Sequence, residues 1–526
     1  MFILNLIVFL IVLGVIVLIH EFGHYIVAKK FGVLVFEFAF GMGPLLYGKK
    51  KGETQYSIRA IPLGGFCAMG GEDINKALIK KNQTIGLLLD ENGNAKEILL
   101  SSNLESSVSG VVTDFDLYGD NNSNLFITLL VSEEEHTYNV NRDAVYVEKT
   151  LNIFKKEVKK QLQIVPKERS FESKPAYQRF LVLIAGVTLN FILALFIFML
   201  LNFVDVNRYK PSQSNVIGSS NYEASTILKT NDKIISINGI DINNWDEIGL
   251  WKNTPSTYES VTLNYERDGV IYQNNVINTV ISVYAAGIYN IDSNGKIRNA
   301  DKDGNRAAIV GQVVDISKDL KEGDKIVAIN SEVVNNWDDV INYFRTNTNG
   351  GKTAFHIIRD DKEVTVNIEA YSQKLLKGQG INSFEVSIGL SPIQHFDFGY
   401  ALKSGFKEFG SNAIIIFTTL GQLFSGTVKI TQLSGPVGIF QVVGSAMKGG
   451  INSILFIIGL LSVNVGIMNL LPIPALDGGR VLFLIIEAIT RKKVNRKVES
   501  IINNVFYIAL LAFMAVIIVL DVLKLF

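Results

Sequence analysis

Residues 1–25, MFILNLIVFLIVLGVIVLIHEFGHY, decide how this chain folds. The run up to Ile19 is apolar apart from Asn5, and as a helix rising about 1.5 Å per residue it would cross about 30 Å of hydrocarbon. A secretory signal peptide is the alternative, but no basic segment precedes the run and no A-x-A cleavage site follows it. The sequence therefore predicts a transmembrane helix that leads directly into the polar motif HEFGHY.

That motif, His20-Glu21-Phe22-Gly23-His24, has the form H-E-x-x-H. Positions i and i+4 lie on one face of a helix, so both imidazoles can reach one Zn²⁺. Glu21 would lie beside the ion, where its carboxylate can take a proton from water. The alternative, a pair of interfacial histidines, would not require Glu21. Three ionisable side chains in hydrocarbon are costly, which favours a functional site.

The composition is that of a membrane protein. Of 526 residues, 48% are hydrophobic and 19% are charged, against about 25% charged in soluble domains. Lys+Arg and Asp+Glu both number 50, which argues against a nucleic-acid binder steered by a basic field. Cys67 is the only cysteine, so the chain has no internal disulfide and no Cys-based zinc site.

Three further apolar runs, at residues 180–203, about 454–471 and about 505–520, predict a total of four spans. Basic residues follow the first span, precede the second, and gather between the third and fourth. By the positive-inside rule these loops are cytoplasmic. Both termini, and everything between spans two and three, are then expected outside.

Two histidines and a water leave zinc one protein ligand short. His356 and His395 fall on the outer side in this topology, so the best candidate is Asp477, in LLPIPALDGGR at the cytoplasmic end of span three. Pro472 and Pro474 would break the helix there, and irregular backbone at membrane depth needs protein or a wet cavity around it. An aspartate in a solvent-facing turn is the alternative.

A repeat lies between the second and third spans. NDKIISINGIDINNWDEI (231–248) matches GDKIVAINSEVVNNWDDV (323–340), and one constant shift also relates Arg267 to Arg359. The pattern indicates a duplicated module that resembles a PDZ domain, whose strand edge can take up a peptide. Neither copy has a clear Gly-rich carboxylate-binding loop, so spacers or size filters are the alternative. Between spans one and two, residues 74–169 predict a small β-rich cytoplasmic insert in which His136 is an exposed loop residue.

Together these residues resemble the site-2 protease family of intramembrane zinc metalloproteases, in its bacterial RseP/RasP branch. The resemblance covers most of the chain and rests on these stretches: HEFGHY (20–25), FGMGP (40–44), IPLGGFCAMGGE (61–72), SFESKPAYQRF (170–180), AGVTLNF (185–191), LSGPVGI (433–439) and LSVNVGIMNLLPIPALDGGRVLF (461–483). In the fifth stretch Val187 replaces the family's usual proline, while Gly186 and Asn190 remain.

The resemblance implies a role for each site residue. His20, His24 and Asp477 would bind one Zn²⁺, and Glu21 would be the catalytic base. Asn469 would orient substrate or stabilise the oxyanion, with Asn464 as a further candidate. Residues 36–66 would form a membrane-reentrant β-hairpin, and residues 399–426 an amphipathic helix at the outer surface.

The expected fold is a polytopic α-helical membrane protein with four transmembrane helices, a membrane-reentrant β-hairpin, tandem extracytoplasmic PDZ-like α/β domains and a small cytoplasmic β-rich insert. The expected segments are helix 1 with HExxH (1–30), the hairpin region (31–73), the insert (74–169), helix 2 (170–204), the PDZ-like domains (205–295 and 296–371), a peripheral amphipathic segment (372–450), helix 3 with the LDG motif (451–482), and a cytoplasmic loop with helix 4 (483–526).

The expected function is cleavage of transmembrane segments by a zinc endopeptidase of the bacterial cytoplasmic membrane. By resemblance, its partners are the lipid bilayer and single-span substrates, such as anti-sigma factors after a first extracytoplasmic cut and remnant signal peptides, and not nucleic acid. A non-catalytic membrane scaffold or chaperone that holds peptides is the rival from another class. A zinc transporter would need polar residues across several spans, and these spans are apolar away from their cytoplasmic ends.

Overall fold

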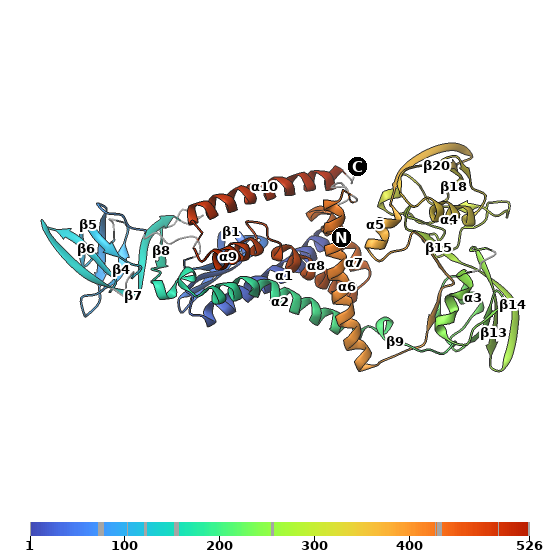
Figure 1. The fold of residues 1–526 in the computed structure, drawn as a ribbon, viewed down its shortest axis with the longest axis horizontal. Helices are drawn as coiled ribbons and strands as arrows, with labels where there is room; N and C mark the ends of the chain where they lie inside the picture. The colour runs from blue at the N-terminus through green and yellow to red at the C-terminus, as the bar shows by residue number, and fades with distance from the viewer. Residues whose placement is uncertain are drawn as a thin grey trace. The chain divides into compact units, whose positions relative to one another are not determined.

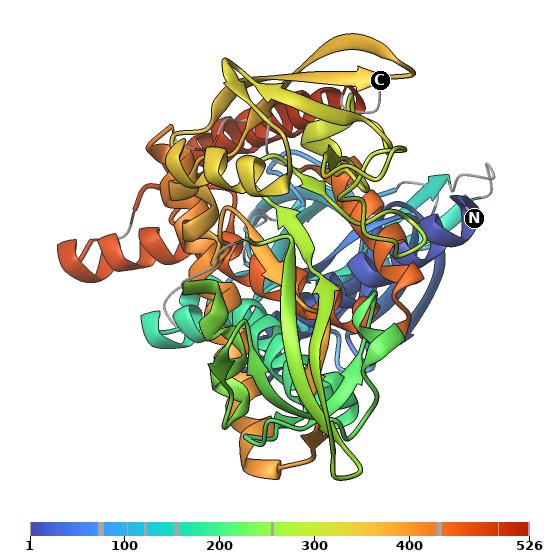
Figure 2. The ribbon, with the colours of Figure 1, turned by 90° about the vertical axis from the view of Figure 1, so that its right-hand side faces the viewer.

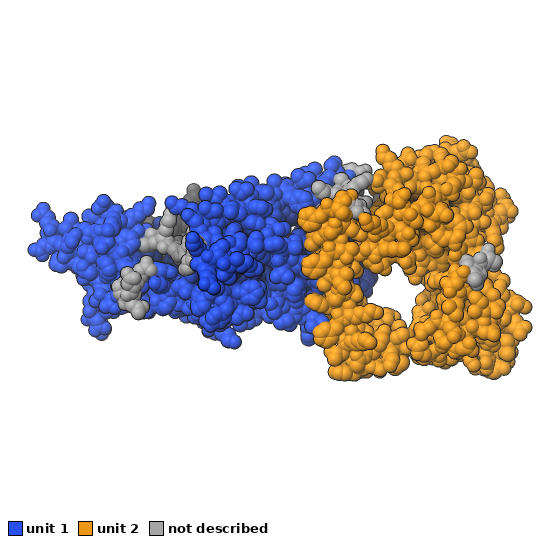
Figure 3. Space-filling model, in the orientation of Figure 1, with its two compact units in different colours: residues 1–197, 434–526 blue, residues 198–433 orange. Residues whose placement is uncertain are grey.

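The structure is a computed structural model, drawn as a ribbon in Figure 1. It describes residues 2–71, 78–101, 104–119, 124–151, 157–253, 257–426, 428, 434–492 and 494–523. Parts of the predicted insert, and Glu72 and Leu433 at the ends of two quoted motifs, lie outside the described residues. The chain divides into two compact units, Met1–Ile197 with Ser434–Phe526 and Phe198–Leu433 (Figure 3).

Within the described residues, four helices are long and apolar enough to cross a membrane: α1 (Phe2–Lys30), α2 (Ala176–Val204), α8 (Ile451–Leu470) and α10 (Arg496–Leu523). This confirms the four predicted apolar helices as candidate spans, and each helix is longer than the apolar run that predicted it. Helix α1 continues through the H-E-x-x-H motif and ends at Lys29 and Lys30, whose charges favour a helix C-terminus. The motif therefore lies inside a regular helix. Helix α2 runs without a break through Val187.

Two shorter helices complete the first unit, α7 (Pro436–Lys448) and α9 (Asp477–Thr490). A long hairpin follows α1, formed by β1 (Val35–Lys51) and β2 (Thr54–Met69). Its register joins Lys51 to Thr54 at the turn and Val35 to Met69 at the open end. The hairpin packs against α1, because a Cβ placed on Gly14 would lie 2.8 Å from the Phe40 ring.

The insert between α1 and α2 contains a six-stranded sheet in the order β4-β3-β5-β6-β7-β8. Its strands are β3 (Thr84–Leu89), β4 (Ala95–Leu99), β5 (Val108–Asp116), β6 (Phe126–Val131), β7 (Glu134–Leu151) and β8 (Glu157–Gln163). Alternating apolar residues such as Leu87, Ile127 and Leu129 form its buried core. His136 is exposed as predicted, but it lies in β7 opposite Leu129 rather than in a loop.

The second unit contains several small antiparallel sheets, which Figure 2 turns toward the viewer. Its strands are β9 (Lys210–Pro211), β10 (Ile217–Ser220), β11 (Lys233–Ile237), β12 (Ile240–Asp241), β13 (Ser260–Arg267), β14 (Val270–Asn278), β15 (Val280–Val283), β16 (Ile288–Tyr289), β17 (Ala308–Ile309), β18 (Lys325–Ile329), β19 (Glu332–Val333), β20 (Gly351–Arg359), β21 (Lys362–Ala370), β22 (Glu385–Ser387), β23 (Leu390–Pro392) and β24 (Gln394–His395). Its helices are α3 (Ala224–Ile227), α4 (Trp337–Thr346), α5 (Gln373–Gly378) and α6 (Phe398–Phe424).

The sequence repeat is also a repeat of strand pairing. Lys233 pairs with Glu266 in the first copy and Lys325 with Ile358 in the second, at the same shift along the chain. The copies are not simply consecutive, however. In the first copy β10 pairs with β23, which follows the second copy in sequence. At the equivalent place in the second copy, residues 311–313 bond instead to β16, which precedes them. The segment predicted as 372–450 therefore supplies a strand to the first repeat.

Each copy contains the same buried ion pair. Arg267 donates from Nε and Nη2 to the two carboxylate oxygens of Asp232 at 2.7 and 2.6 Å, and Arg359 does the same to Asp324 at 2.7 and 2.6 Å. Both aspartates are 1% exposed. Burial alone would raise the pKa of Asp232, but hydrogen bonds from Arg267 and from the Lys229 backbone N–H lower it below its ordinary value.

We expect Arg267→Met to lower the free energy of unfolding of the second unit by about 3 kcal/mol at pH 7, because it leaves a buried carboxylate without its main partner. The pKa of Asp232 is depressed in the folded state, so its contribution is present above about pH 4 and is lost as the pH falls further. The difference between the two proteins should therefore shrink below pH 4. Urea unfolding at pH 7 and at pH 3, followed by tryptophan fluorescence, measures both effects.

The full chain suits this measurement because its three tryptophans, Trp245, Trp251 and Trp337, all lie in the second unit. Trp251 and Trp337 are buried, so their emission reports the packing of that unit. Lys362→Met is the matched control, since it removes an exposed cation from β21. Equal stability of the Arg267 and Lys362 variants at pH 7 would contradict the prediction.

Candidate metal centre

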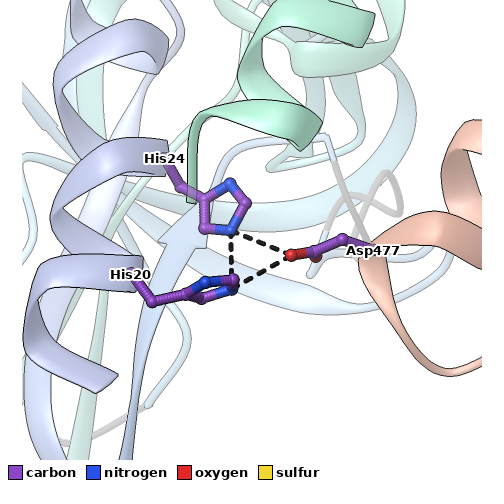
Figure 4. A group of neighbouring side chains, drawn as sticks. All are labelled: His20, His24 and Asp477. Atoms are coloured by element: carbon purple, nitrogen blue, oxygen red, sulfur yellow. Dashed lines mark hydrogen bonds and ion pairs between the residues drawn. The ribbon is translucent and has the colours of Figure 1, made fainter. Parts of the chain in front are cut away.

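Three side chains from two helices converge in the first unit (Figure 4). His20 and His24 lie on one face of α1, and Asp477 is the first residue of α9. The Oδ2 atom of Asp477 lies 3.0 Å from His20 Nε2 and 3.2 Å from His24 Nε2, and the two nitrogens lie 3.3 Å apart. Both histidines are buried. Among the described residues, these three form the one group of His, Cys, Asp and Glu side chains placed to hold a metal ion.

The geometry of this triangle fits zinc. Bonds of about 2.0–2.1 Å at tetrahedral angles place ligand atoms about 3.3 Å from one another. The three observed separations, 3.0, 3.2 and 3.3 Å, are close to that value. Two imidazole nitrogens and one carboxylate oxygen are also a donor set that zinc accepts. The triangle would leave the fourth position of a tetrahedral ion for water or substrate.

Helices α1 and α2 pack closely beside the triangle because each has a glycine at the point of contact. A Cβ on Gly23 would lie 2.4 Å from the Ala185 carbonyl oxygen, and a Cβ on Gly186 would lie 2.4 Å from His24 Nε2. Small residues at a helix crossing let two backbones approach in this way. Gly186 therefore faces the Nε2 atoms of both histidines directly, and a side chain at this position would fill the space beside them.

Asp477 reaches the histidines because the chain turns sharply after α8. That helix ends at Leu470, and the residues around Pro472 and Pro474 connect it to α9 without regular structure. Ala475 has a positive φ of 78°, and its N–H is held by the Asn503 side chain of α10 at 3.3 Å. The turn folds α9 back so that its first residue faces α1. The Asp477 side chain is 20% exposed and faces the two histidines, which does not fit an aspartate in a solvent-facing turn.

The atoms around the two imidazoles fix their orientation. His24 Nδ1 lies 2.8 Å from the Val182 carbonyl, which can only accept, so this nitrogen carries the proton and leaves Nε2 free for a metal. Asn469 Nδ2 lies 3.4 Å from His20 Nε2, at the edge of the triangle. Asn190 Nδ2 lies 3.3 Å from His20 Nδ1. Of these neighbours, the family resemblance implied a role for Asn469 alone.

The other candidate residues lie in distinct places. Glu21 follows His20 on α1, and its Cγ lies 3.6 Å from an ideal Cβ on Gly65, so β2 passes beside this carboxylate. Asn464 lies on α8 more than one turn before Asn469. His356 is in β20, bonded to Thr365 at 3.1 Å, and His395 is in β24. These two histidines belong to the second unit and not to the group that could hold a metal.

Comparison with known proteins agrees with the triangle. The sequence profile of peptidase family M50 matches residues 8–513. The chain is 30% identical over 525 residues to zinc metalloprotease RasP of Geobacillus kaustophilus, covering 99% of this chain and 98% of that one. It is 29% identical to zinc metalloprotease RasP of Shouchella clausii over 528 residues, with 99% of each chain covered. It is 28% identical to RasP of Bacillus licheniformis over 526 residues, again with 99% of each covered.

Proposed function

The chain belongs to peptidase family M50 and is a zinc metalloprotease with four candidate membrane spans, and we propose on this premise that it cleaves substrate helices within the bilayer. One observation carries the proposal. The histidine and aspartate triangle lies between apolar helices, at His20 of α1 and Asp477 beyond the end of α8. A peptidase centre at that position meets peptide bonds that lie in or near the membrane.

In this proposal His20, His24 and Asp477 hold one zinc ion, which when bound supplies a Lewis acid and lowers the pKa of a ligated water. Glu21 takes the proton from the attacking water and passes it to the amine that leaves. The Asn469 amide, next to the triangle, donates a hydrogen bond to the carbonyl oxygen as negative charge develops on it. The closeness of Asn469 to the triangle, and the position of Glu21 next to His20 on α1, support these roles.

The hairpin supplies the substrate's backbone contacts in this proposal. A helical substrate must unwind before its amide can be attacked, because helical carbonyls are already hydrogen-bonded, and unpaired backbone is costly in lipid. Strand β2 passes beside Glu21 at Gly65. A strand edge there, dipping into the membrane from the cytoplasmic side, would pair with the unwound segment and compensate its lost hydrogen bonds.

We further propose that the loops rich in Lys and Arg are cytoplasmic, which places the metal centre near that side of a bacterial cytoplasmic membrane. The two repeats would then be PDZ-like domains outside the cell membrane. They would exclude substrates whose outer domain is still bulky and admit those already cut once. Single-span anti-sigma factors and remnant signal peptides have the required form: one apolar helix with little attached outside.

Removing the repeats should release this restriction. Ser212 N–H donates to the Ile393 carbonyl at 2.7 Å, and the neighbouring β9 and β24 pair with each other, so the ends of residues 213–392 lie together. A variant in which a short Gly-Ser linker replaces residues 213–392 keeps the pairing of β9 with β24 on either side of the linker. We expect it to cleave a single-span substrate with an intact outer domain, which the full chain should cleave only after a first cut.

The measurement is the cleaved fraction of tagged substrate, with and without its outer domain, in membranes containing either enzyme. Cleavage of the short substrate by both enzymes is the internal control for an intact active site. A continued requirement for the first cut in the shortened enzyme would contradict size exclusion by the repeats. Loss of all cleavage when Glu21 becomes Gln tests the catalytic proposal separately.

A further inference from the structure

Asn190 is a buried polar residue next to the metal centre. It lies on α2, is 0% exposed, and its Nδ2 atom is 3.3 Å from His20 Nδ1. Its other amide atom, Oδ1, is buried with no hydrogen-bond partner. Leaving a buried acceptor unpaired costs about 1–3 kcal/mol, so a buried amide in this state calls for an explanation.

The chemistry of His20 supplies that explanation. Its Nε2 atom is the one that faces Asp477 and His24 in the triangle. An imidazole that binds a metal through Nε2 is neutral and carries its remaining proton on Nδ1. That Nδ1–H needs an acceptor, whereas the Asn190 NH₂ group facing it can only donate. With a metal bound, this contact would join two donors.

A half-turn of the Asn190 amide would make the contact with His20 a hydrogen bond and would move the NH₂ group to the place that Oδ1 now occupies. The oxygen and nitrogen of an amide exchange places when the group rotates by 180°, at little change in shape. Oδ1 then faces His20 Nδ1 and gains a partner, and the imidazole proton gains an acceptor. His24 already has the matching arrangement, with Nδ1–H donating to the Val182 carbonyl on the same helix.

We propose that Asn190 is a positioning residue of the metal centre, whose amide oxygen accepts the Nδ1 proton of His20 and so holds Nε2 toward the metal. This inference rests on the proposed ligand set and goes beyond the proposed function, since it gives a positioning role to a residue that is not one of the three ligands. Helix α2 thereby orients both ligating imidazoles, one through a main-chain carbonyl and one through a side chain. The Ser462 hydroxyl donates to the main-chain carbonyl oxygen of Asn190 at 2.9 Å, and this bond holds that turn of α2 against α8.

The test is the zinc affinity of the full chain in detergent, measured by competition between the metal-stripped enzyme and a chromophoric chelator. Removing a partner that orients a metal-bound histidine typically weakens metal binding about 10–100-fold. We expect that loss for Asn190→Ala. We expect Asn190→Asp to bind zinc about as tightly as the unchanged protein, because a carboxylate oxygen also accepts from Nδ1–H.

Two comparisons separate this role from simple packing. Thr188→Ala, which alters an exposed hydroxyl of the same helix, should leave zinc affinity unchanged. Asn190→Leu refills the volume without an acceptor and should bind zinc as weakly as Asn190→Ala. Wild-type affinity in Asn190→Leu, or equal weakening in Asn190→Asp and Asn190→Ala, would overturn the proposal. Because zinc affinity is read without substrate, failure of the proposed intramembrane cleavage would not affect the result.

Discussion

Replacing Glu21 by Gln should abolish peptide-bond cleavage while leaving the bound zinc in place. Glutamine matches glutamate in size but cannot take a proton from water, and removing a general base typically costs about 10²–10⁴-fold in rate. The metal should remain because the three atoms of the triangle come from His20, His24 and Asp477 and not from Glu21. Cleavage of a tagged single-span substrate in detergent, with zinc counted in both proteins, measures the two effects together.

The matched control for this experiment is Glu97→Gln, which removes a carboxylate from the sheet of the insert. It should cleave like the unchanged protein and hold the same amount of zinc. Equal cleavage by the Glu21 variant, with zinc retained, would move the base to another residue. If neither protein cleaved and neither held zinc, the rival interpretation of a membrane scaffold that binds peptides would regain support.

Much of the metal centre follows from local sequence alone. The i, i+4 spacing of His20 and His24 fixes their common face as soon as α1 is a helix. The apolar run before them predicts that helix, because about 20 apolar residues match the thickness of a bilayer. Asp477 could be named because two prolines and two glycines surround it, and the structure brings its carboxylate to 3.0 Å from His20. Short-range patterns were sufficient for the two histidines, whereas the choice of Asp477 also needed the predicted topology, which puts His356 and His395 on the outer side.

Other features depend on contacts between distant parts of the chain, which periodicity does not reveal. Asn190 meets His20 only because Gly23 and Gly186 let α2 approach α1 closely. Similarly, the pairing of β10 with β23 joins strands separated by the whole second repeat. The internal repeat suggested two consecutive modules, since a repeat carries no information about which later strand completes the first copy.

The contact of Gly186 with the two histidines predicts a second substitution with a large effect on zinc binding. Gly186→Ala should prevent normal zinc binding, because its added methyl group would lie 2.4 Å from His24 Nε2 and 2.9 Å from His20 Nε2. Those are the atoms that must face the ion, and both rings are buried, so they have little room to move aside. A displacement of about 1 Å at a catalytic site typically costs about 10²-fold in rate. We expect zinc content and cleavage to fall together.

Gly410→Ala is the matched control, since it adds the same methyl group to a helix, α6, where an ideal Cβ meets no atom within 4 Å. Alanine also favours helix over glycine, so neither substitution should weaken its helix through propensity. Zinc counted per protein and the rate of substrate cleavage, measured for both variants, separate a local clash from a general loss of folding. Full zinc content in Gly186→Ala would mean that the triangle opens toward a side other than α2. A fall in zinc for both variants would point to a global defect, whereas a fall confined to Gly186→Ala places the ion against this turn of α2.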